Sequence, residues 1–71
     1  MTRERKNELI ETLLQERAEM HHAYGKYNTG QAERFYAALD TFRKSGRLSR
    51  DMRRHMEFEL RQHLELYPEE A

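Results

Sequence analysis

The chain has 71 residues, with no cysteine, no tryptophan and no valine, one proline and three glycines. Without cysteine it can form neither disulfides nor thiolate metal sites. One isoleucine and no valine disfavour strands, whereas the abundant Glu, Arg, Leu, Gln and Met favour helices. The composition therefore predicts an all-α protein.

Net charge and long apolar runs are also missing. Thirteen Lys and Arg balance thirteen Asp and Glu, so the formal net charge is zero, and no global field draws the chain onto nucleic acid or an acidic membrane. No apolar run has the length of a membrane span or a signal-peptide core. We expect a cytoplasmic protein without membrane contact, of the kind that bacteria and their phages use as small accessory proteins.

The clearest helical pattern covers residues 49–67, where apolar side chains recur along one side of a helix. Ser49 is a suitable N-cap and Pro68 a natural stop. The side expected to be buried consists of Met52, Met56, Leu60, His63, Leu64 and Tyr67. The charges run against the helix dipole, because arginines fill the start of this helix and glutamates its end.

Two other segments show the same period, residues 2–24 and 30–45. The expected apolar face of the first consists of Leu9, Ile10, Leu13, Leu14, Met20, His21 and Tyr24. That of the second consists of Ala32, Phe35, Tyr36, Leu39 and Phe42. With residues 49–67 these segments predict a single domain, 1–71, folded as a compact antiparallel three-helix arrangement. A core of this size is marginal, which favours dimerisation.

Phe58 is the candidate centre of a dimer seam. It points away from the apolar side of its helix and stands midway between Ser49 and Tyr67. If two copies crossed antiparallel at Phe58, the basic start of each would lie against the acidic end of the other. We therefore predict a homodimer through the third helix, with Phe58, Arg54, Gln62 and Glu65 in the seam. The alternative is that an exposed Phe on a mixed surface has no partner.

A basic cluster covers the turn before this helix. It consists of Arg43, Lys44, Arg47, Arg50, Arg53 and Arg54, with only Asp51 opposing it. Such a cluster can face phosphates, although no Asn or Gln stands near the helix start to read bases. It can equally be a solvated face paired with acidic residues. Together with Tyr24 and Tyr27, these residues are also candidate anchors for a larger protein partner.

The sequence gives little support for chemistry. His55, Glu59 and His63 follow one another along one helix side, but the second Glu-x-x-His pair and the inward glutamates of a di-metal bundle are missing. Ser45 and Ser49 stand in a turn without a strained elbow, and the chain is short for a substrate pocket. We expect no enzyme activity, no metal, no cofactor and no small-molecule substrate.

The stretch Phe35-Tyr36-Ala37-Ala38-Leu39-Asp40 is similar to the Phe-Tyr-x-Ala-x-Asp stretch of the Hha-like small nucleoid modulators. The resemblance covers six residues, and this chain lacks the tryptophan-bearing C-terminus of that family. It implies a helical regulator that binds a DNA-binding partner.

The interpretation that these patterns favour is a small non-enzymatic interaction or regulatory module, an adaptor or inhibitor acting as a homodimer. The alternative is a nucleic-acid-binding or nucleoid-associated regulator that uses the basic cluster at 43–54.

Overall fold

Three helices make up almost all of the computed structural model, which describes residues 1–25 and 29–71. They are α1 (Arg3–Ala23), α2 (Thr29–Ser45) and α3 (Arg50–Leu66), and a short 3-10 helix, η2 (Pro68–Glu70), follows them. The described ranges contain no strand. The predicted all-α fold of three helices is confirmed, with every helix boundary within one residue of its predicted position.

Capping residues and a glycine close to each boundary explain where the helices begin and end. The side chains of Thr2 and Ser49 cap α1 and α3, accepting hydrogen bonds from the backbone N–H of Arg5 at 3.1 Å and of Met52 at 3.2 Å. Gly46 follows α2 with a φ of +70°. Because residues with a Cβ rarely adopt this left-handed conformation, a glycine here ends the helix at low cost.

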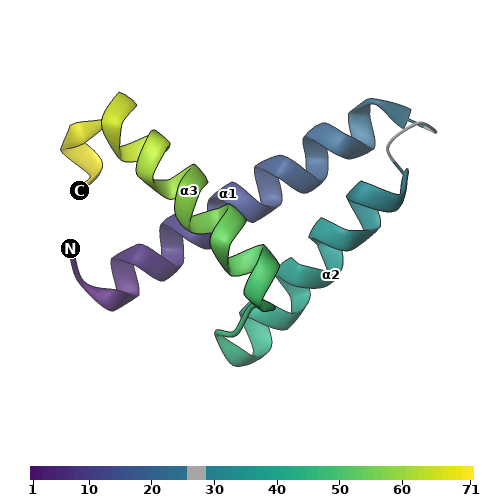
Figure 1. Ribbon diagram of the computed structural model, residues 1–71, viewed down its shortest axis with the longest axis horizontal. Helices are drawn as coiled ribbons and strands as arrows, with labels where there is room; N and C mark the ends of the chain where they lie inside the picture. Colours follow the sequence, from purple (N-terminus) through teal and green to yellow (C-terminus); the bar gives the residue numbers. More distant parts are fainter. Residues whose placement is uncertain (26–28) are drawn as a thin grey trace.

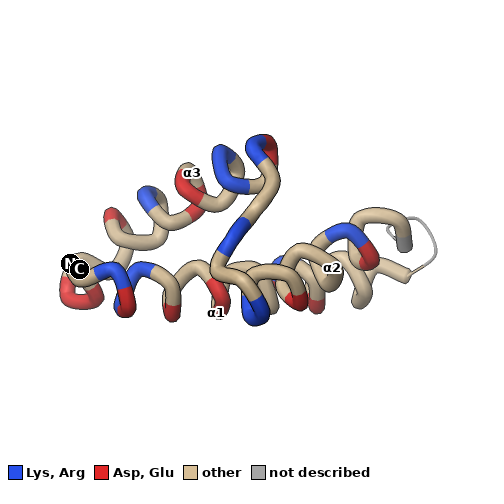
Figure 2. The backbone as a smooth tube through the Cα atoms, turned by 90° about the horizontal axis from the view of Figure 1, so that it is seen from below, with Lys and Arg blue, Asp and Glu red and all other residues tan. Residues whose placement is uncertain are grey.

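The helices form two layers. α1 and α2 pair as an antiparallel hairpin, and α3 lies across one face of it, mainly over α1 (Figure 1). Seen from the side, the hairpin is one layer and α3 a ridge above it (Figure 2). The molecule is accordingly flat, with extents of 37 × 27 × 16 Å.

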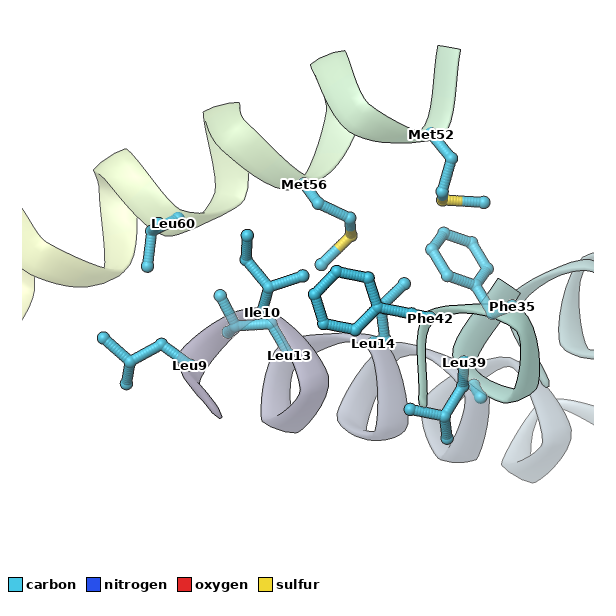
Figure 3. Packing of buried hydrophobic residues seen from close by; sticks show 11 residues of the cluster. Leu9, Ile10, Leu13, Leu14, Phe35, Leu39, Phe42, Met52, Met56 and Leu60 are labelled. Atoms are coloured by element: carbon cyan, nitrogen blue, oxygen red, sulfur yellow. The ribbon is translucent and has the colours of Figure 1, made fainter. Parts of the chain in front are cut away.

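The core lies where α3 crosses the hairpin. Leu14 of α1 and Met56 of α3 have no exposed surface. Met56 points toward Ile10 and Phe42, and Met52 points toward Phe35 (Figure 3). The buried apolar side chains of the described residues are Leu9, Ile10, Leu13, Leu14, Ala18, Ala32, Phe35, Leu39, Phe42, Met52, Met56 and Leu60.

Some residues of the predicted apolar faces remain outside this core. Met20 and Tyr24 are 38% and 64% exposed, and Tyr36 and Tyr67 are also exposed, whereas Ala18 is fully buried. The end of α1 and the start of α2 extend beyond α3 (Figure 1). The last turns of the apolar stripe of α1 therefore have no third helix over them.

None of the helices in the described ranges is long and apolar enough to cross a membrane.

Candidate functional site

The reversed charges of α3 are partly explained by α1. Lys6 pairs with Glu57 at 3.5 Å, and Arg17 pairs with Glu59, whose side chain is only 14% exposed. The acidic half of α3 is thus held against cations of α1 in the same chain. These two pairs lie on the two sides of the crossing of α3 over α1, which the buried apolar side chains hold, and each contributes up to about 1 kcal/mol.

The cations differ sharply in whether they have a carboxylate partner. Twelve of the thirteen Lys and Arg lie in the described ranges, and five of them form ion pairs. These are Arg5, Lys6, Arg17, Arg43 and Lys44. The other seven have no carboxylate within 4.0 Å among residues 1–25 and 29–71: Arg3, Arg34, Arg47, Arg50, Arg53, Arg54 and Arg61.

Six of these seven surround the connection from α2 to α3, and we call them the arginine surface: Arg3, Arg34, Arg47, Arg50, Arg53 and Arg54. Arg3 and Arg53 line one hollow beside Gly46. Arg34 and Arg47 line another beside Ser49. Figure 2 shows Lys and Arg gathered along this connection and at the start of α3.

Two members of the predicted basic cluster are in a different situation. The Nε of Arg43 lies 2.5 Å from a carboxylate oxygen of Glu11, and its Nη2 donates to Gln15 at 3.0 Å. Lys44 pairs with Asp40, four residues earlier on α2, at 3.0 Å. Their charges are therefore partly neutralised within the chain, whereas those of Arg47, Arg50, Arg53 and Arg54 are not.

The predicted self-association residues share the outer face of α3. Phe58 is 53% exposed, and Arg54, Gln62 and Glu65 are exposed on the same side of the helix. This face lies opposite Met56, which packs into the core. The structure thus brings the four residues together on one accessible surface.

The two tyrosines proposed as partner anchors fall elsewhere. Tyr24 is exposed at the end of α1, on the part of the hairpin beyond α3 (Figure 1). Tyr27 lies outside the described residues. The structure therefore does not join Tyr24 with the arginine surface in a single site.

The histidines take part in local contacts. His55 Nε2 is 3.7 Å from Glu59 Oε1, and the ring of His55 packs against Phe35 with centroids 5.7 Å apart. His63 bonds to Glu70 of η2. In the described part of the chain no three His, Cys, Asp or Glu side chains are placed to hold a metal ion.

Sequence analysis missed two members of the arginine surface, Arg3 and Arg34. Arg3 stands far from residues 43–54 in sequence and lines the same hollow as Arg53 only because α3 crosses over α1. Arg34 could have been suspected, because it lies on the side of α2 that faces α3 together with Ala38 and Thr41.

Comparisons of the chain with protein-family models, with curated proteins and with solved structures gave no significant match.

Proposed function

We propose that this chain is a small non-enzymatic interaction module that regulates a larger protein and self-associates through the outer face of α3. The observation that supports this most directly is Phe58, an aromatic residue with 53% of its surface exposed at the midpoint of α3. The opposite side of the helix is committed to the core through Met52, Met56 and Leu60. An exposed aromatic gains free energy when a partner covers it. On size and composition we propose a cytoplasmic setting, in a bacterium or a phage.

A second copy of the same chain suits this face because the face can pair with itself. If two α3 helices crossed antiparallel at Phe58, Arg54 would lie level with Gln62 of the second copy and about 4.5 Å along the axis from its Glu65. Asp51 would lie level with that same Glu65, a like-charge pair that Arg54 offsets by reaching both. Each of these contacts would occur twice about the two-fold axis.

The seam would be small. A helix of 17 residues is about 25 Å long and about 10 Å wide, so one helix face covers roughly 250 Å² per partner. Stable interfaces bury about 800 Å² per partner. We therefore expect a weak dimer that dissociates on dilution, with free surface left for a larger partner at Tyr24 and at the arginines.

The solution mass of wild type and Phe58→Asp tests the seam. Light scattering over a dilution series should show the wild type, a chain of 8.7 kDa, approaching twice that mass at high concentration. Phe58→Asp should remain a helical monomer, because the two introduced carboxylates would face each other at the two-fold axis and the apolar contact of the two rings would be lost.

The matched control is Tyr36→Asp, which introduces the same carboxylate at an exposed aromatic of α2. It should dimerise as the wild type does. Wild type that stays monomeric at every concentration, or equal loss of mass in both variants, would contradict the proposed seam.

A further inference from the structure

We propose that the arginine surface binds the phosphate backbone of a double-stranded nucleic acid, without reading its sequence. This inference concerns Arg3, Arg34, Arg47, Arg50, Arg53 and Arg54. It does not depend on self-association.

The first step is the uneven distribution of unpaired charge. Of the seven described cations without a carboxylate partner, only Arg61 lies away from this surface. The carboxylates near the surface are Glu57, which is occupied by Lys6, Asp51 in the first turn of α3, and Glu4 and Glu33, which adjoin Arg3 and Arg34 in sequence. A chain with zero net charge therefore carries a concentrated local positive potential, which attracts a polyanion over a short range.

The second step is the chemistry of the cations. All six are arginines, whose guanidinium groups bind phosphate oxygens with two parallel hydrogen bonds and lose less hydration than lysine ammonium groups. Four of them line two hollows that have Leu48 in common: Arg3 and Arg53 line the one between α1 and α3, and Arg34 and Arg47 line the one between α2 and the connection. Side chains arranged over a surface in this way can contact several phosphates at once.

The third step is the shortage of exposed apolar side chains on this surface. This shortage distinguishes between the kinds of anionic partner. Between residues 37 and 57, which carry Arg47, Arg50, Arg53 and Arg54, no large apolar side chain is exposed. The exposed Met1, Tyr36 and Phe58 stand at the margins of the surface. Protein interfaces centre on aromatic or aliphatic anchors, and single-stranded nucleic acids are bound by aromatic stacking. Amphipathic helices that bind membranes insert apolar residues. A duplex backbone needs none of these.

Adenine-reading side chains are few at this surface, where Asn7 lines the hollow of Arg3 and Arg53. Neither the connection at 46–49 nor the first two turns of α3 carries an Asn or Gln. With phosphate contacts alone, affinity depends on salt and not on sequence. If four of the six guanidinium groups contact phosphates, the log–log slope of affinity against salt is about −3.6, so raising salt from about 50 to about 200 mM weakens binding about a hundredfold.

The test is fluorescence anisotropy with a labelled DNA duplex of mixed sequence, titrated at several salt concentrations. We expect saturable binding with that slope for the wild type. Arg50→Gln/Arg53→Gln removes two unpaired guanidinium groups and should lower the steepness of the slope by about two. This variant keeps Arg54 and Phe58 of the outer face of α3, and its solution mass separates its effect on duplex binding from loss of the dimer.

The matched control is Arg43→Gln/Lys44→Gln, which removes the same charge from neighbouring positions already paired with Glu11 and Asp40. It should keep the wild-type slope, and circular dichroism should show both variants as helical as the wild type. No saturable binding at low salt, or an equal loss in both double variants, would overturn the proposal.

Competition distinguishes the anion classes. The unlabelled duplex should displace the labelled one at lower phosphate concentration than its separated single strand does. It should also outcompete a polyglutamate peptide and phosphatidylserine vesicles at matched negative charge. If the single strand, the peptide or the vesicles compete as well as the duplex, the surface is not a duplex-backbone site.

Discussion

Met56 and Leu14 are completely buried in the core. They show how far the hydrophobic periodicity of the sequence predicts the burial of a single residue. The period correctly assigned both to the core. It also assigned Met20 to the same kind of face, yet Met20 is 38% exposed. Periodicity gives the direction in which a side chain points, but burial depends on whether another helix lies there.

This contrast predicts that the same substitution, Met to Ala, lowers the free energy of unfolding much more at position 56 than at position 20. Met56→Ala should lower the free energy of unfolding by about 2–5 kcal/mol, because it removes buried methylene groups and leaves a cavity beside Phe42. Met20→Ala should change it by less than about 1 kcal/mol. Urea unfolding followed by circular dichroism measures both. Equal losses would mean that the core does not lie where α3 crosses the hairpin.

Ion pairs between distant residues were beyond the reach of sequence reasoning. Lys6–Glu57 and Arg17–Glu59 join residues 51 and 42 positions apart. The sequence showed an unusual charge order in residues 49–67 but did not show which part of the chain compensates it. The same limit hid Arg3 from the basic cluster, since only the crossing of α3 over α1 brings it there.

At the scale of an element, helix boundaries were predictable because their causes are local. Thr2 and Ser49 cap the helices that follow them, and Gly46 takes the left-handed conformation after α2. Each of these signals acts within about four residues of its own position. None requires knowledge of where another helix lies.

The backbone conformations of Gly46 and Gly30 predict stability changes of opposite sign when each glycine is replaced by alanine. Gly46→Ala should destabilise the chain by about 1 kcal/mol, because its φ of +70° strains a residue that has a Cβ. Gly30→Ala should stabilise it by up to about 1 kcal/mol, since Gly30 is helical with open space around its Cα. Thermal unfolding of the two variants checks the signs. A stabilising Gly46→Ala would show that the end of α2 is not left-handed.

At the scale of the whole molecule, the crossing of α3 decides which surfaces remain available. Three helical segments with short connections predicted an antiparallel three-helix arrangement, and the all-α fold is confirmed. The hydrophobic stripes did not specify that α3 lies across the hairpin and leaves the end of α1 uncovered. They therefore predicted burial for Tyr24 and Tyr36, which are exposed.

The same crossing presents the two surfaces on which our proposals depend. It turns Phe58 away from the hairpin and leaves a hollow between α1 and α3 that Arg3 and Arg53 line. Self-association and phosphate binding then use adjoining parts of α3, which share Arg54. A dimer would carry two arginine surfaces, one near each end of the seam.

The most direct test of self-association is a charge swap between Arg54 and Glu65, read out as solution mass. Within one helix the two residues are about 16 Å apart along the axis and cannot pair. In an antiparallel seam, Arg54 of each copy approaches Glu65 of the other. Arg54→Glu should weaken dimerisation about fivefold, because it brings like charges together twice at a surface seam. Glu65→Arg should weaken it less, because it sets arginines against each other but also replaces the like-charge pair of Asp51 and Glu65 by a pair of opposite charge.

The double variant Arg54→Glu/Glu65→Arg restores opposite charges across the seam and nowhere else. We predict that sedimentation equilibrium will give it a dimer dissociation constant no higher than that of the wild type, because Arg54 and Glu65 only exchange charges and Asp51 then faces a cation in place of Glu65. If its loss equals the sum of the two single losses, the two residues do not meet. The proposed antiparallel dimer through α3 would then be wrong.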